Sequence, residues 1–137
     1  MIRDIGAVTQ RQLLVYWANQ SGPIDKRDVY GFGDLLQGRS GADIDLLLQS
    51  PGGDIDIAEK LVYLCRARAK AFRMIVPESA KSAATLIALA GDVIVMSDTS
   101  ELGPIDPQVI VTTADGNTLM RPAPVLSGWH RGNQEGG

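Results

Sequence analysis

The sequence predicts an α/β fold with a mostly parallel sheet, because apolar strands and helices alternate along it three times. A continuous apolar run of strand length lies at residues 13–18, and strands rich in apolar residues are predicted at 44–49 and 72–76. A turn and then a helical pattern follow each run. Units of this length imply right-handed crossovers between parallel strands. Functional groups are therefore expected where the strands end and the helices begin.

The first unit joins the strand at 13–18 to a helix that begins after Asp25. Residues 19–23 are turn-prone, and Asp25 is a favoured residue for capping the first helical amides. The apolar positions of this helix are Val29, Phe32, Leu35 and Leu36. The glycine-rich segment from Gly38 to Gly41 predicts where the helix ends.

The second unit contains the clearest helix of the sequence. The strand at 44–49 stops at Ser50-Pro51-Gly52-Gly53, because proline cannot continue a hydrogen-bonded ladder. Asp54 then caps a helix with apolar residues at three- and four-residue spacing and basic residues towards its C-terminus. The apolar positions are Ile57, Ala58, Leu61, Val62 and Cys65, and the basic ones are Arg66, Arg68 and Lys70. Cys65 lies on the apolar face and is predicted to be a core residue.

The third unit joins the strand at 72–76 to an apolar helix at 82–90 through a turn at 77–81. A further strand is predicted at 92–96. The pattern thus repeats the order of strand, turn and helix seen in the first two units.

Two parts of the chain are expected from these patterns. Residues 1–120 form the α/β domain, with a last strand at 109–113. Residues 121–137 contain proline and several glycines, and their end has no core-forming residues. This second segment is predicted to be loop-rich and either disordered or truncated.

The composition argues against several classes of function. The net charge of −3 gives no electrostatic reason to expect a nucleic acid partner. One cysteine and one histidine are too few soft ligands for a zinc site. The start of the chain has no apolar signal region, and the longest apolar run, 86–90, is too short to span a bilayer. We therefore expect a cytoplasmic, reduced protein without metal or cofactor.

Gly52 and Gly53 form a candidate anion-binding turn. They follow a strand and open a helix, so their backbone amides can face an anion with the positive end of the helix behind them. This is how an oxyanion hole is built. The alternative is a tight turn that simply requires two permissive glycines.

Ser82 is a candidate nucleophile at the next junction between a strand and a helix. Its neighbours Lys81-Ser82-Ala83-Ala84 are small apart from the lysine, so a substrate can approach the hydroxyl group. The alternative is a helix-capping serine, which is a common residue at this position. Two such signals at successive junctions favour a catalytic interpretation.

The stretch from Leu46 to Gln108 resembles the core of the serine dehydrogenase proteinase family, whose distant relatives are the Clp proteases and signal peptide peptidase A. Ser50 to Gly53 matches the oxyanion motif of that group, and Pro77 to Thr85 resembles its nucleophile segment. Ser100 to Gln108 resembles its downstream motif, and a weaker likeness covers Leu13 to Leu36. The resemblance implies a Clp/crotonase-like fold of repeated β-β-α units with a mostly parallel sheet.

The resemblance also implies a catalytic triad in the order serine, aspartate, histidine. Ser82, Asp106 and His130 occur in that order, and His130 is proposed because it is the only histidine and lies downstream. The amides of Gly53 and Ala83 would bind the oxyanion. The alternatives are that Asp106, between Ile105 and Pro107, shapes a turn and that His130 is a surface residue.

Two features separate this sequence from related patterns. Related nucleophile segments commonly have glycine where this chain has Ala84, and the added methyl group can narrow the site. Relatives of signal peptide peptidase A use a lysine base, but no lysine follows Ser82. Lys81 is adjacent, and neighbouring helical positions do not face each other. Ser79 is a second serine nearby but falls outside the nucleophile position.

The resemblance implies a serine endopeptidase that acts through a Ser82 acyl-enzyme on a peptide or protein, with membrane-associated substrates among the candidates. It also implies a homo-oligomer. A crotonase-like acyl-CoA enzyme is one alternative and would need a positioned acidic side chain, for which Glu78 and Glu101 are the candidates. A catalytically degenerate Clp-like scaffold, in which Ser82 only caps a helix, is the other.

Overall fold

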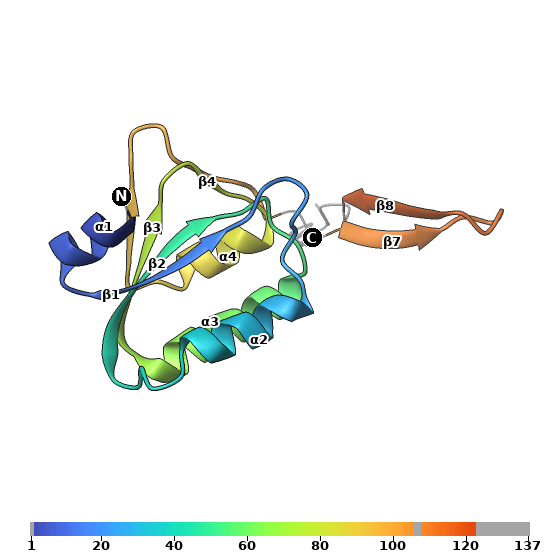
Figure 1. Ribbon diagram of the computed structural model, residues 1–137. Helices are drawn as coiled ribbons and strands as arrows, with labels where there is room; N and C mark the ends of the chain where they lie inside the picture. Colours follow the sequence, from blue (N-terminus) through green and yellow to red (C-terminus); the bar gives the residue numbers. More distant parts are fainter. Residues whose placement is uncertain (1, 106–107, 123–137) are drawn as a thin grey trace, which may run out of the picture. The chain divides into compact units, whose positions relative to one another are not determined.

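Within the residues that the computed structural model describes, which are 2–105 and 108–122, a parallel sheet of four strands forms the frame of the first part of the chain (Figure 1). The strands lie side by side in chain order, and each neighbouring pair is parallel. They are β1 (Gln12–Trp17), β2 (Ala42–Gln49), β3 (Ala69–Val76) and β5 (Val93–Met96). The predicted α/β class and the mostly parallel sheet are confirmed.

The helices connect successive strands of this sheet. They are α2 (Lys26–Leu35), α3 (Ile55–Arg68) and α4 (Ala83–Leu89). Because each new strand is added on the same side of the last, crossovers of the preferred right hand carry all three connecting helices to one face. Figure 1 shows α2 and α3 running side by side beneath the sheet, with which α4 also packs.

The core lies between the sheet and these helices. Alternate residues of β2 and β3 are fully buried against it, and α3 and α4 contribute the facing side chains. The strand residues are Ile44, Leu46, Leu48, Phe72, Met74 and Val76, and the helical ones include Ala58, Leu61, Cys65, Ala84 and Ile87. The apolar-rich segments at 44–49 and 72–76 therefore lie in the central strands β2 and β3, as predicted.

The predicted helix caps are present in the structure. Asp25 accepts a hydrogen bond from the Arg27 amide at 2.7 Å, and the Asp28 carboxylate accepts one from the Asp25 amide at 2.8 Å, which completes a capping box. Asp54 accepts from the Ile57 amide at 3.1 Å at the start of α3. Both capped helices therefore begin at the residues that the sequence indicated.

The opposite face of the sheet contains a buried carboxylate. Asp45 is fully buried and forms ion pairs with Arg11 at 2.5 Å and Arg73 at 2.6 Å. Arg11 also donates to the carbonyls of Ile44 and Ala71. These contacts fix the segment before β1 to the two central strands.

The sequence interpretation missed some short elements and misplaced several boundaries. A helix, α1 (Ile2–Thr9), precedes β1. β3 begins at Ala69 rather than residue 72, so Lys70 lies in a strand and not at the helix C-terminus. The segment expected as a turn at 77–81 contains β4 (Ser79–Ala80), which pairs with β6 (Glu101–Leu102). Pairing over two residues leaves no pattern in the sequence to detect.

The chain divides into two compact units, residues 1–105 and 106–137. In the second unit, β7 (Gln108–Thr112) and β8 (Thr118–Pro122) form an antiparallel hairpin. The predicted strand at 109–113 corresponds to β7. β8 was not predicted, because Pro122 favours a break, and this proline is the final residue of the strand. The domain boundary at residue 120 stays a prediction.

Candidate functional site

The turn after β2 has a backbone that requires glycine. Gly52 has a φ of 104° and Gly53 a φ of 147°, a region that other residues rarely adopt. A Cβ atom at Gly53 would lie 2.3 Å from the backbone nitrogen of Ile24, so the chain packs too closely there for any side chain. The two glycines are needed for conformation and for close packing.

Hydrogen bonds fix this turn from two sides. The buried hydroxyl of Ser50 accepts from the Gly52 amide at 3.1 Å. On the other side, the Ile24 amide donates to the Gly52 carbonyl at 2.8 Å, and the Asp54 amide donates to the Ile24 carbonyl at 2.9 Å. The Gly53 amide donates to none of the described residues, which leaves one N–H group free for an external acceptor.

Ser82 occupies the position before α4 in an unusual backbone conformation. Its φ is 50° and its ψ is −124°, which is outside the regions where an L-residue is comfortable. Its side chain makes no capping hydrogen bond, so the capping alternative does not describe this serine. Strain of this kind costs about 1–3 kcal/mol and is concentrated at functional sites.

The two candidate motifs meet in space. A Cβ atom at Gly52 would lie 2.7 Å from the Cβ of Ser82, 2.7 Å from the Lys81 carbonyl oxygen and 3.3 Å from the Ala83 nitrogen. The Ala83 amide, like that of Gly53, has no acceptor among the described residues. The structure therefore brings the Ser82 side chain and the Ala83 backbone against the Gly52–Gly53 turn, so the two predicted motifs form one candidate site.

The chain belongs to the ClpP-like SDH-type serine proteinase family. The family model of that description matches residues 37–119, which is more than half of the 137 residues and includes both motifs. This match confirms the resemblance drawn from the three motifs of the sequence.

Two curated relatives from Methanocaldococcus jannaschii are similar to part of the chain. The uncharacterized protein MJ0137 is 44% identical over 66 residues, which cover 48% of this chain and 23% of the relative. The uncharacterized protein MJ1495 is 36% identical over 66 residues with the same coverage of 48% and 23%. The matched region thus spans about a quarter of the length of these relatives.

Two solved structures are also similar to this family member. One is a lysine-to-alanine mutant of the 1510-N membrane-bound stomatin-specific protease in complex with a substrate peptide, at a TM-score of 0.58 and 22% identity, covering 82% of this chain and 53% of that one. The other is the ClpP protease catalytic domain from Plasmodium falciparum, at a TM-score of 0.49 and 16% identity, covering 71% and 61%. The likeness to the stomatin-specific protease shows that this chain and that protease share a fold.

The nucleophile segment is attached to the rest of the site by buried polar groups that the sequence interpretation missed. The Lys81 amide donates to the Ser50 carbonyl at 3.0 Å. The buried Thr85 hydroxyl lies 2.9 Å from the Ala80 carbonyl oxygen and 3.0 Å from that of Gly103. A threonine within the otherwise apolar α4 was the available signal, since a buried hydroxyl group needs partners.

The lysine beside the candidate nucleophile is paired with another side chain. Lys81 Nζ lies 2.5 Å from Glu101 Oε2, and this ammonium group holds the pKa of the Glu101 carboxyl below its usual range. Ser79 lies in β4, outside the junction that carries Ser82. Ala84, where the resemblance led us to expect glycine, is fully buried in the core cluster.

Two predicted site residues, Asp106 and His130, lie outside the described residues. Within the described part of the chain, no group of three or more histidine, cysteine or acidic residues is arranged to hold a metal ion. In the same part of the chain, no helix has the length and apolar character needed to cross a membrane.

Proposed function

We propose that this protein hydrolyses peptide bonds through an acyl-enzyme on Ser82. The observation that carries the proposal is the strained backbone of Ser82, whose side chain makes no capping hydrogen bond and whose Cβ lies against Gly52. A serine kept in this conformation without a structural hydrogen bond fits a nucleophile better than a helix cap. Membership of the serine proteinase family supports the same conclusion.

In this mechanism, Ser82 Oγ attacks the scissile carbonyl carbon and its proton passes to a general base. The negative charge that develops on the carbonyl oxygen accepts hydrogen bonds from the amides of Gly53 and Ala83. The base then protonates the leaving amine, and water releases the acyl group by the reverse sequence. The loss of one oxyanion donor typically reduces the rate about 100- to 1000-fold.

His130 is our candidate for the general base, and Asp106 for the residue that orients it. No lysine follows Lys81 in the sequence, and Lys81 itself is paired with Glu101. Within these 137 residues, a lysine base of the kind used by relatives of signal peptide peptidase A therefore has no candidate after Ser82. A histidine base, whose ordinary pKa is near neutrality, suits proton transfer at neutral pH.

The substrate is proposed to be a peptide or protein, because the stomatin-specific protease of the same fold binds a substrate peptide. A membrane-associated protein is one candidate substrate, since that protease is itself membrane-bound and specific for stomatin. Assembly into a homo-oligomer and a cytoplasmic location are further parts of the proposal. Analytical ultracentrifugation would test the first of these.

Mass spectrometry after treatment with a fluorophosphonate probe tests the nucleophile. We expect one adduct, on the peptide that contains Ser82, and its loss in Ser82→Ala. Ser79→Ala is the matched control, because that hydroxyl group lies on β4 three residues away and should not affect labelling. His130→Ala should then slow labelling by at least about 100-fold.

A folded sample without an adduct would contradict the proposal and favour a scaffold. A crotonase-like enzyme would instead bind coenzyme A and would not need Ser82. Of its two candidate acids, Glu101 is exposed and paired with Lys81. Calorimetric titration with coenzyme A separates this alternative from the peptidase.

A further inference from the structure

A cavity of about 300 Å³ lies at the carboxyl ends of β1 and β2, where parallel sheets commonly bind ligands. It adjoins both catalytic motifs, because Pro51 and Lys81 in its wall directly precede Gly52 and Ser82 in the chain. Its other walls include Trp17, Gln49 and Glu78. A peptide bound at Ser82 would therefore have one of its side chains beside this cavity.

The polar wall of the cavity is held in place by one amide side chain. Gln49 Oε1 accepts from the Ser79 amide at 2.9 Å. Gln49 Nε2 lies 3.3 Å from Glu78 Oε2 and 3.3 Å from the Ser79 hydroxyl oxygen. Gln49 thus connects the end of β2 to the turn after β3 and orients the Glu78 carboxylate.

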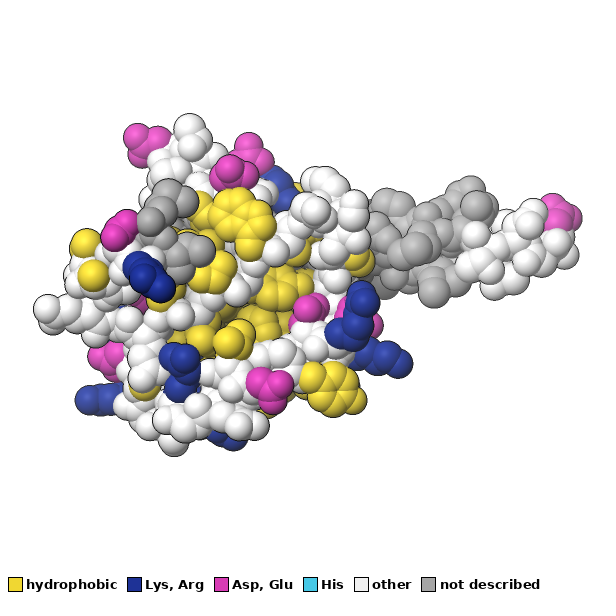
Figure 2. All heavy atoms as spheres, viewed as in Figure 1, with side chains coloured by type: hydrophobic (Ala, Val, Ile, Leu, Met, Phe, Trp, Pro, Cys, Tyr) yellow, Lys and Arg dark blue, Asp and Glu magenta, His cyan; other side chains and the backbone are white. Residues whose placement is uncertain are grey.

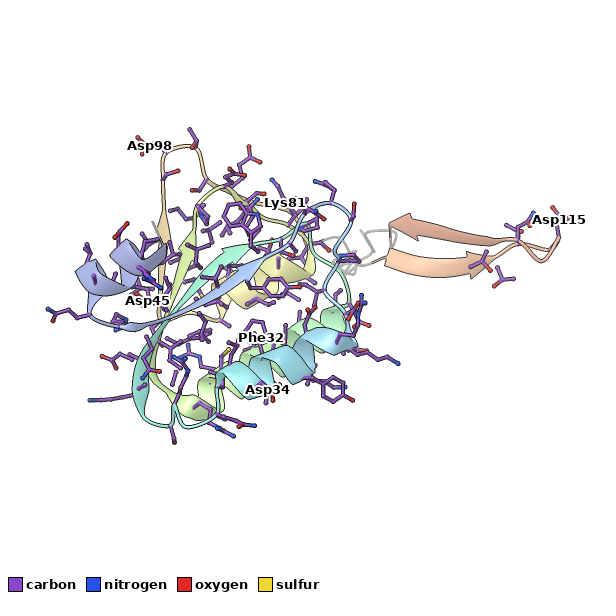
Figure 3. All side chains as sticks on the ribbon, viewed as in Figure 1. Phe32, Asp34, Asp45, Lys81, Asp98 and Asp115 are labelled. Carbon is purple, nitrogen blue, oxygen red and sulfur yellow. The ribbon has the colours of Figure 1, made fainter. Side chains whose placement is uncertain are left out.

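The charge of Glu78 has no cationic partner among the described residues. The nearest candidate along the chain, Lys81, is paired with Glu101 at 2.5 Å, so its charge is already balanced. Arg11 and Arg73 are paired with the buried Asp45. Figure 3 shows Asp45 well away from Lys81, so these arginines belong to another part of the sheet. With Lys81 and Glu101 counted together as a neutral pair, Glu78 leaves one negative charge at the cavity.

Trp17 supplies an aromatic surface to the same cavity, and 56% of this residue is exposed. Figure 2 shows hydrophobic side chains gathered in the middle of the viewed face, with charged groups around its margins. A flat guanidinium group can stack on an indole ring and donate two parallel hydrogen bonds to a carboxylate. A lysine ammonium group would match the charge but not the flat surface.

We infer that this cavity is a subsite that binds a basic side chain, arginine above all, of the peptide substrate. The inference rests on the proposed peptidase function and adds a substrate preference to it. The excess of acidic over basic residues in the chain, a net charge of −3, favours the approach of such a peptide.

Binding to the full chain carrying Ser82→Ala tests the inference without any turnover. The probes are fluorescein-labelled alanine-glycine hexapeptides with a single arginine at each position in turn, and matched peptides with citrulline, which has the same shape without the charge. We expect the best arginine peptide to bind about 10-fold more tightly than its citrulline partner in fluorescence polarisation. Raising the salt concentration should reduce this ratio.

Glu78→Gln in the same background should reduce the ratio of arginine to citrulline affinity to about one. Asp34→Asn is the matched control, because it removes one negative charge from an exposed position on α2. Figure 3 shows Asp34 well separated from Lys81 in the cavity wall. It should leave the ratio unchanged. Trp17→Ala should weaken the arginine peptide more than the citrulline peptide.

Equal affinity for both kinds of peptide, no binding of either kind, or an unchanged ratio in Glu78→Gln would each overturn the inference. These results do not depend on acylation of Ser82. Failure of fluorophosphonate labelling would remove the proposed function, whereas failure of arginine discrimination with normal labelling would remove only the subsite.

Discussion

Gly52 and Ser82 are in such close contact that a Cβ atom at position 52 would lie only 2.7 Å from the Cβ of Ser82. The contact joins the turn after β2 to the start of α4, although the two residues are 30 positions apart in the chain. Any residue but glycine at position 52 must displace the candidate nucleophile or the turn itself.

Gly52→Ala is therefore expected to abolish fluorophosphonate labelling and to destabilise the fold by about 3 kcal/mol, because it adds a steric clash and a strained φ. Gly33→Ala is the control, since no atom lies within 4 Å of a Cβ atom there and the helix favours alanine. This control should gain about 0.5–1 kcal/mol and label normally. Urea unfolding and labelling rates measure both effects, and normal labelling of Gly52→Ala would refute the close contact.

Asp45→Asn is expected to destabilise the fold by about 3 kcal/mol, because it leaves two guanidinium groups without their buried carboxylate. The control is Asp43→Asn, whose carboxylate is 48% exposed and lies 3.5 Å from Arg11. This surface pair should contribute less than about 0.5 kcal/mol. Equal midpoints for the two variants in urea would contradict the assignment of Asp45 as the centre of the cluster.

Asp92 is expected to make stability depend on pH in the acid range. The Phe72 amide and then the Arg66 guanidinium lower the pKa of this carboxyl from its ordinary value of 3.8. A lowered pKa in the folded state means that the stabilisation is complete above 3.8 and is lost as pH falls through the lower folded value.

The difference in unfolding free energy between the wild type and Asp92→Asn should therefore be largest at neutral pH and shrink below about pH 4. Asp98→Asn serves as the control, because the Asp98 side chain has no hydrogen bond to the described residues. Urea titrations at several pH values measure the difference. A gap that stays constant down to pH 2 would count against this role for Asp92.

Cys65 is expected to resist alkylation in the folded protein. It is 1% exposed, and burial raises the pKa of its thiol to about 12, so little reactive thiolate forms at pH 8. Iodoacetamide should modify it at least about 1000-fold more slowly than in the unfolded chain. Tyr63→Cys on the exposed face of α3 should add a thiol that reacts at once. Rapid reaction of both thiols would show that α3 opens readily.

The sequence predicted the central strands and capped helices because their signals are local. Apolar runs, the carboxylates at Asp25 and Asp54, and the spacing of the α3 residues each act within a few positions of the chain. The boundary errors fell where tertiary pairing extends an element, as at the start of β3. Local patterns therefore determined the order of elements but not their ends.

Long-range polar contacts could not be predicted in the same way. The partners of Asp45 lie 34 and 28 residues away along the chain, and a single aspartate within an apolar strand does not indicate which arginines reach it. The backbone angles of Ser82 were equally hidden, because a capping serine and a strained serine have the same sequence. Only the structure distinguishes them, through its φ of 50° and its missing cap.

The two hydrogen bonds around Ile24 have a consequence for the energetics of binding. They hold the carbonyl of Gly52 and the amide of Asp54, so the peptide units on either side of Gly53 are fixed before any ligand arrives. The conformational entropy of this turn is lost when the chain folds rather than when a ligand binds. An anion that reaches the Gly53 amide therefore meets a rigid donor, and almost all of the hydrogen-bond energy remains available for affinity.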